Sequence, residues 1–200
     1  MIFIALAVFS ARYSLAENAA IITSPKNIIQ GEPLMIRVDG ETINDVARIL
    51  FTGKSLWFFT YNNKPSALFP IDLNQKPGDY KITVKLENGN VIEKTITVTA
   101  REKIEEPLGI PAKLGGNTPQ AATNLVTNLV KENAVINSVK SALKRYWNEK
   151  FIYPVANPIV TDSYGYLRKT GYYTIPHKGT DFRASVDTPV LAMNRGIVRL

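Results

Sequence analysis

Polar and hydrophobic residues alternate with a period of two in several short runs between residues 19 and 100. The clearest run places Tyr80, Ile82, Val84 and Leu86 between Lys81, Thr83, Lys85 and Glu87. Asn88 and Gly89 follow and suit the left-handed backbone of a two-residue hairpin turn, after which residues 91–98 resume the alternation. Short strands separated by turn signals predict a small antiparallel β sandwich of the immunoglobulin-like kind over residues 17–100.

An aromatic run, Trp57, Phe58 and Phe59, lies inside this predicted β domain. Exposed rings could stack on sugars, whereas buried rings would fill the core of the sandwich. Because large aromatic side chains in strands are mostly buried, we expect core packing for this run. Whether the β domain is a spacer, a folding partner or a binding surface stays open.

The alternation stops near residue 100. Residues 101–117 contain two prolines and three glycines and predict a linker or an irregular crossing segment. Thr118 and Pro119 then favour a helix start, because threonine caps a first turn and proline suits its first position. Hydrophobic residues recur every three or four positions at Leu125, Leu129, Ile136, Val139, Leu143 and Tyr146. Residues 118–150 therefore predict a helical connector, made of one amphipathic helix or two shorter ones.

From residue 151 onward the helical period is lost. Pro154, Pro158 and Pro176 would each break a helix, and the intervening residues are typical of short strands and turns. Residues 188–200 predict two strands on either side of a turn near residues 194–196. The expected fold class is mainly β with one long helix: an immunoglobulin-like sandwich, a helical connector and then an antiparallel β domain over residues 151–200.

The motif "IPHKGTDFRA" contains His177, the only histidine of the 200 residues, and Asp181 four positions later. Imidazole and carboxylate groups are both good zinc ligands. Pro176 stiffens the approach to the motif, and Gly179 permits a sharp backbone path between the two side chains. Taken alone, a histidine and an aspartate at this spacing also fit an ordinary hydrogen-bonded surface pair.

Three segments in a fixed order place this motif in a wider pattern: "PIVTDSYGYLRK" from Pro158, "HKGTDFRA" from His177 and "DTPVLAMNRGIV" from Asp187. Together they resemble the lysostaphin-type (LytM-like) zinc metallopeptidases, which cut peptidoglycan. Two positions depart from the family pattern, since Asp187 stands where glycine is usual and Tyr164 where phenylalanine is more common. Secreted members with an accessory β domain are also similar in their organisation.

The resemblance implies that residues 151–200 are the N-terminal part of a peptidase domain that is truncated at residue 200. His177 and Asp181 would be the first two of three Zn²⁺ ligands. The third ligand and the catalytic histidines would lie beyond Leu200, so no catalytic residue is assigned within this chain. The implied activity is a zinc-dependent endopeptidase acting on the peptide stems or cross-bridges of bacterial peptidoglycan, with the 200 residues alone inactive.

Two other classes of function remain open. The chain could be a catalytically inactive, peptidase-like protein that binds the wall or regulates another hydrolase. It could also be a structural envelope or adhesion protein, which would bind no zinc. Other polar residues near the motif, Asp162, Arg168 and Lys178, could touch substrate or order the ligands, but we interpret them as solvated loop charges. Four tyrosines could line a peptide or glycan groove: Tyr164, Tyr166, Tyr172 and Tyr173.

The N-terminus and the charge bear on the compartment and on the partners. Residues 1–9 form an apolar run, and Ser14-Leu15-Ala16 fits a cleavage site, so residues 1–16 predict a secretory signal peptide although no basic residue precedes the run. The run is too short for a stable transmembrane segment, and the mature protein would be exported to the periplasm, the cell envelope or the medium. The absence of cysteine excludes disulfides and thiolate zinc sites. The net charge of +7 is scattered and does not favour nucleic acid as a partner.

Overall fold

The computed structural model describes residues 19–140 and 144–199, so the predicted signal peptide lies outside the described residues. The chain divides into two compact units. The first contains the described residues up to Lys26, with Leu34–Phe69 and Asp79–Ile96; the second contains Asn27–Pro33, Pro70–Gly78 and the described residues from Thr97 onward.

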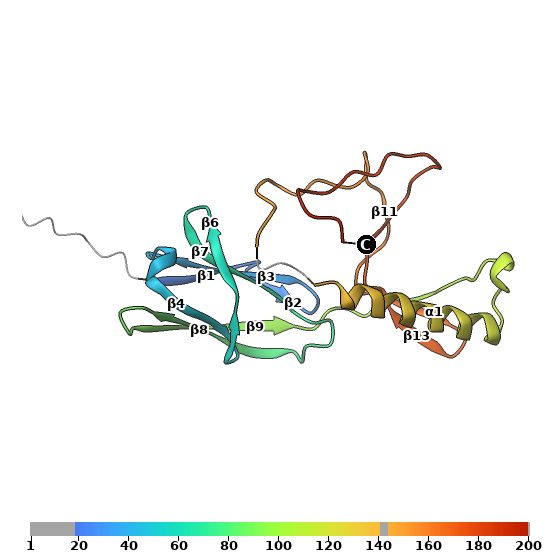
Figure 1. Ribbon diagram of the computed structural model, residues 1–200. Helices are drawn as coiled ribbons and strands as arrows, with labels where there is room; N and C mark the ends of the chain where they lie inside the picture. Colours follow the sequence, from blue (N-terminus) through green and yellow to red (C-terminus); the bar gives the residue numbers. More distant parts are fainter. Residues whose placement is uncertain (1–18, 141–143, 200) are drawn as a thin grey trace, which may run out of the picture. The chain divides into compact units, whose positions relative to one another are not determined.

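Two sheets make up the β sandwich (Figure 1). The strands of one sheet follow the order β1 (Ala20–Ser24), β3 (Pro33–Asp39), β7 (Lys64–Pro70) and β6 (Phe58–Tyr61). Those of the other follow the order β2 (Ile28–Ile29), β9 (Val91–Thr99), β8 (Gly78–Leu86), β4 (Val46–Phe51) and β5 (Lys54–Leu56). A short 3-10 helix, η1 (Ile43–Asp45), precedes β4. Within the sandwich, the pairs β1–β3, β6–β7, β4–β5 and β4–β8 are antiparallel, and β2 runs parallel to β9.

The sandwich core follows from the alternation of the sequence. Leu34, Ile36 and Val38 of β3 are fully buried, while the residues between them are partly exposed. The ring centroids of Phe51 in β4 and Phe69 in β7 lie 4.3 Å apart, so the inner faces of the two sheets meet. The expectation of a mainly β fold with a sandwich in its N-terminal half is confirmed.

Two local predictions in the sandwich are wrong. The loop between β8 and β9 comprises residues 87–90, and only Gly89 is left-handed, with φ +88°. The side-chain oxygen of Asn88 instead accepts a hydrogen bond from the amide of Asn90 at 2.9 Å, which stabilises a longer turn. Of the aromatic run predicted to pack in the core, Trp57 lies between β5 and β6 and is 42% exposed, while Phe58 and Phe59 are half-buried. The rings of Trp57 and Phe59 are tilted by 30°, with centroids 5.0 Å apart.

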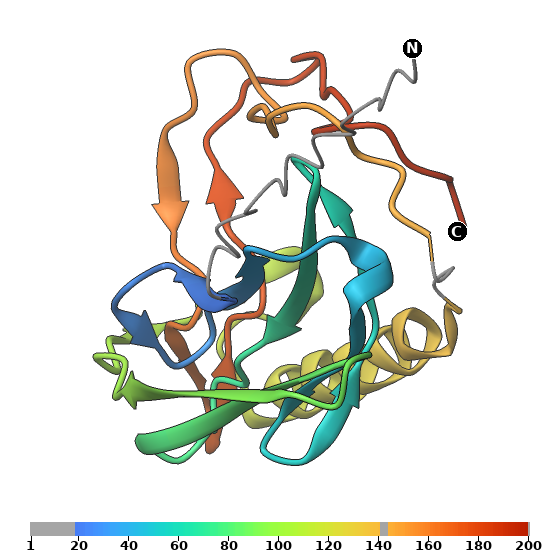
Figure 2. The ribbon, with the colours of Figure 1, turned by 90° about the vertical axis from the view of Figure 1, so that its left-hand side faces the viewer.

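The long helix α1 (Pro119–Ser138), yellow in Figure 2, begins where the sequence predicts. The hydroxyl of Thr118 accepts the amide hydrogen of Ala121 at 3.2 Å. The helix ends at Ser138 rather than near residue 150, and the described residues 144–150 are not helical. At that end Val139 is extended and its amide donates to the carbonyl of Ile136, while the hydroxyl of Ser138 donates to the carbonyl of Val135.

The remaining strands form two small sheets in the second unit. β10 (Glu105–Pro107) runs parallel to β12 (Leu167–Thr170), which pairs antiparallel with β13 (Tyr173–Pro176). β11 (Val160–Asp162) pairs antiparallel with β14 (Asp181–Phe182). The segment predicted as a linker thus contributes a strand, β10, followed by the 3-10 helix η2 (Ala112–Leu114).

The two strands expected within residues 188–200 do not form in the described part of that segment. Two backbone hydrogen bonds connect it to residues 152–154 instead, from the amide of Ile152 to the carbonyl of Met193 and from the amide of Leu191 to the carbonyl of Pro154. These two bonds are too few for a strand ladder.

Candidate metal centre

The end of β13 fixes the backbone of His177. Its amide donates to the carbonyl of Tyr166 at 2.7 Å, and its carbonyl accepts the amide hydrogen of Gly165 at 2.8 Å. Gly165 has φ +93°, a turn conformation that a residue with a side chain rarely adopts. His177 is therefore held against the β11–β12 turn, and its side chain is only 19% exposed.

The imidazole ring has a different partner on each nitrogen. Nδ1 lies 3.1 Å from the carbonyl oxygen of Ser163, and since a carbonyl only accepts, Nδ1 must carry the hydrogen. In a neutral ring Nε2 then has the lone pair, and this nitrogen lies 3.4 Å from Oδ1 of Asp181. Two acceptors that face each other repel unless a proton or a metal cation lies between them.

The 3.4 Å separation is compatible with either occupant. It lies at the long end for an N–H···O hydrogen bond, whose commonest length is ~2.9 Å, and it is within reach of an ion pair between a protonated ring and the carboxylate. Imidazole nitrogen and carboxylate oxygen are also both common zinc ligands, so a divalent cation is the second possible occupant. The structure brings the predicted pair, His177 and Asp181, together.

Gly179 lies next to this pair. A Cβ atom at this position would be 3.8 Å from Nε2 of His177, so a longer side chain would crowd the nitrogen. The carboxylate of Asp181, on β14, has a 57% exposed side chain. The His177 imidazole and the Asp181 carboxylate thus both line space that an ion or a small molecule can enter.

Within residues 19–140 and 144–199, no group of three or more His, Cys, Asp and Glu side chains is arranged to hold a metal ion. The nearby Asp162, 19% exposed, is engaged in an ion pair with the guanidinium of Arg168. The same guanidinium lies 3.0 Å from Oε2 of Glu106 in β10, and the Arg168 side chain is only 13% exposed.

This network corrects one interpretation of the sequence. Asp162 and Arg168 are not solvated loop charges, because the Arg168 side chain is only 13% exposed and pairs with both Asp162 and Glu106. Both residues also line the cavity that contains His177. Lys178 is exposed, as expected.

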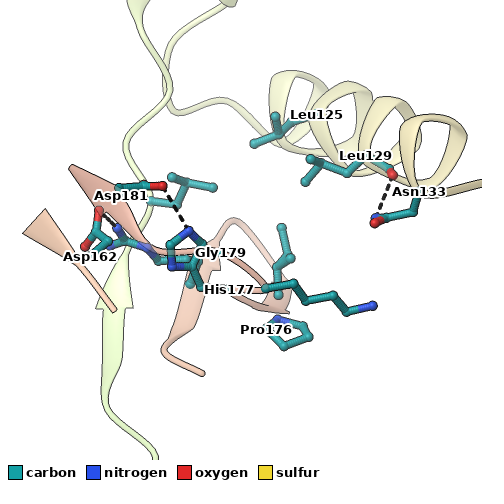
Figure 3. A pocket seen from close by; sticks show the side chains of 12 residues that line it. Leu125, Leu129, Asn133, Asp162, Pro176, His177, Gly179 and Asp181 are labelled. Carbon is teal, nitrogen blue, oxygen red and sulfur yellow. Dashed lines mark hydrogen bonds and ion pairs between the residues drawn. The ribbon is translucent and has the colours of Figure 1, made fainter. Parts of the chain in front are cut away.

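The cavity at the site has a volume of about 490 Å³ (Figure 3). Its lining comprises Leu108, Leu125, Leu129, Asn133, Asp162, Arg168, Ile175, Pro176, His177, Lys178, Gly179 and Asp181. None of the four predicted tyrosines lines it: Tyr164 lies under Arg101, and the hydroxyl of Tyr173 contacts that of Thr123. Leu125 and Leu129 of α1 were not among the predicted site residues, because their helical spacing predicts only a buried face and not what that face contacts.

The fold is mainly β with one long helix, and its N-terminal part is a two-sheet sandwich of the class that includes immunoglobulin-like and fibronectin type III domains. No protein-family model matches the chain, and no curated protein does so either. In the part of the chain that the structure describes, no helix is both long and apolar enough to cross a membrane.

Several solved structures are similar to part of the chain. A polysaccharide lyase shares 12% identity at a TM-score of 0.35, over 44% of this chain and 13% of that one. The BIgI domain of the beta protein from S. agalactiae shares 20% identity at a TM-score of 0.29, over 43% and 99% of the two chains. Fibronectin(III)-like modules of Clostridium thermocellum CbhA share 17% identity at a TM-score of 0.29, over 43% and 48%. These TM-scores are too low to support an inference about activity or partners.

Proposed function

We propose that this chain is part of an exported, zinc-dependent endopeptidase that hydrolyses peptide cross-links in bacterial peptidoglycan. The observation that carries the proposal is the 3.4 Å separation of Nε2 of His177 and Oδ1 of Asp181, with Nδ1 engaged by the Ser163 carbonyl. A backbone acceptor on the second ring nitrogen is the usual way in which a metal-binding histidine is oriented. The sequence pattern around the motif supports the peptidase class.

In this proposal His177 and Asp181 hold the metal, and a histidine that the 200 residues do not contain completes the site. When bound, zinc would supply a water of pKa ~7 and polarise the scissile carbonyl. The chain's own contribution is positional. The β11–β12 turn fixes the imidazole through the Ser163 carbonyl, Gly179 leaves space beside Nε2, and an apolar wall lines one side of the cavity.

Among the described residues only two candidate metal ligands, His177 and Asp181, come together at this site. This observation favours a second candidate, a peptidase-like protein that binds the wall or regulates a hydrolase without cutting. Both candidates predict an interaction with peptidoglycan. Only the first predicts release of peptide cross-links.

The test is digestion of purified peptidoglycan sacculi by the product of the complete reading frame that contains these residues. We expect zinc-dependent loss of cross-linked muropeptides, measured by liquid chromatography, and loss of this activity in His177→Ala. Arg183→Ala serves as the matched control, because Arg183 is exposed, lies two positions from Asp181 and does not line the cavity.

Intact cross-links after treatment with the zinc-loaded product would refute the endopeptidase and leave the binding candidate. Equal digestion by the His177→Ala variant would refute the assigned metal site.

A further inference from the structure

The first turns of α1 pack on the same small sheet that positions His177. Ala121 and Ala122 are buried with Ile110, and the half-buried Leu125 and Tyr173 pack against them. Close approach at the β12–β13 turn requires glycine: a Cβ at Gly171 would lie 3.1 Å from that of Ala122. This part of the helix is therefore docked on the β12–β13 hairpin.

The same helix face continues past the docked turns. Residues at i, i+3, i+4 and i+7 share one face, so Leu125 and Leu129 follow Ala122 along a single stripe. Leu125 takes part in the docking and also lines the cavity, while Leu129, one turn further, lines the cavity beside the His177–Asp181 pair. Figure 3 shows both leucines pointing from the helix into this space.

The cavity has an apolar and a polar half. The apolar wall comprises Leu108, Leu125, Leu129 and Ile175. The other half holds the His177–Asp181 pair and the exposed ammonium group of Lys178, which forms no ion pair within the described residues. A volume of about 490 Å³ is in the range of small-ligand sites.

These features select the occupant. The aliphatic wall offers no hydrogen bond and no aromatic face to a sugar, so it suits an aliphatic side chain. The polar half suits the amide and carboxylate groups of a peptide. We infer that the cavity is a specificity subsite that takes an aliphatic side chain flanking the scissile peptide bond, with Leu125 and Leu129 of α1 as its selective wall.

The inference rests on the proposed function, because only a peptidase has a scissile bond. The substrates it selects are peptides with an aliphatic residue next to that bond, rather than glycine-only bridges. The helix that the sequence marks as a connector is thereby part of the substrate site.

The test titrates the ¹⁵N-labelled chain with N-acetyl-Gly-Leu-Gly-amide and N-acetyl-Gly-Gly-Gly-amide, monitored by NMR. Burial of a leucine side chain predicts binding about tenfold tighter or more for the leucine peptide. Shifts are expected at Leu129, Ile175 and His177.

Two helix variants separate a specific wall from a general effect on the helix. Leu129→Gln should weaken binding of the leucine peptide at least about fivefold and leave the glycine peptide unchanged. Val130→Gln, at the next position and 64% exposed outside the cavity lining, should bind like the wild type.

Equal affinity for the two peptides, no binding of either, or an unchanged affinity in Leu129→Gln would overturn the inference. The zinc response of the His177 ring is recorded on the same samples. A His177 ring that does not respond to zinc would count against the proposed function. A ring that responds to zinc in a chain that does not select the leucine peptide would count against the subsite alone.

Discussion

Arg168 provides the sharpest energetic prediction, because its guanidinium is nearly enclosed and bridges two carboxylates. Replacement by methionine keeps the aliphatic stem and removes the charge. The Asp162 partner is 19% exposed and would be left without its cation, and hydrogen bonds to charged groups contribute about 1.5–3 kcal/mol. The Glu106 partner is 40% exposed, so its loss adds only about 0.5 kcal/mol. We expect Arg168→Met to lower the free energy of unfolding by about 2–3 kcal/mol.

The neighbouring Lys169 is a matched control. Lys169 lies next to Arg168 on β12 and forms an ion pair with Glu105, the neighbour of Glu106 on β10. Both side chains of this pair are about half exposed. Lys169→Met should therefore cost less than about 0.5 kcal/mol.

The assay is urea unfolding monitored by the fluorescence of Trp147, in a Trp57→Phe background because Trp57 belongs to the first unit. With an m-value of about 2 kcal/mol/M, Arg168→Met should lower the urea midpoint by about 1 M or more. Equal midpoints for Arg168→Met and Lys169→Met would refute the reasoning that burial sets the strength of these pairs.

Three further predictions concern other parts of the fold. Gly171→Ala should destabilise the second unit by about 1–2 kcal/mol in urea unfolding, because φ is +54° and the new methyl group meets Ala122; an unchanged midpoint would contradict the docking of α1. Thr118→Ala should cost about 1 kcal/mol and reduce helicity by circular dichroism, whereas Thr118→Ser should retain most of the cap. The Lys81 ammonium lowers the pKa of Glu93 below its ordinary value of 4.5, so the stability contributed by this pair is present above pH 4.5 and is lost as the pH falls through the lower folded-state pKa. The difference in unfolding free energy between wild type and Glu93→Gln should accordingly shrink on acidification. A difference that grows on acidification would contradict the predicted direction of the pKa shift.

The sandwich was predictable because a half-buried strand imposes its period on the sequence. Leu34, Ile36 and Val38 are buried as their alternation predicts. Trp57 was not predictable from residue type, because its exposure depends on where β5 ends and β6 begins. The end of α1 was missed because hydrophobic residues continue at helical spacing past Ser138, whereas Val139 already has an extended backbone.

The candidate site was predictable only in part. A four-residue spacing across Gly179 brings His177 and Asp181 together, as the motif indicates. The carbonyl of Ser163 that orients the ring lies 14 positions away and depends on the pairing of strands. The leucine wall depends on how α1 docks, which is a tertiary contact that no local pattern encodes.

Zinc titration of the uniformly ¹⁵N-labelled chain, observed at the imidazole nitrogens, tests the central claim most directly. His177 is the only histidine, so every imidazole signal belongs to it. Structural zinc-finger sites with four ligands contribute about 10–16 kcal/mol. Half of this, about 5–8 kcal/mol, is an upper limit for two ligands without a thiolate, so the Kd should be no tighter than about 1 µM. We predict a saturable shift of Nε2 at micromolar to millimolar zinc, little change at the hydrogen-bonded Nδ1, and marked weakening of zinc binding in Asp181→Ala. A ring that does not respond to millimolar zinc, or that responds through Nδ1, would contradict the assignment of His177 and Asp181 as metal ligands.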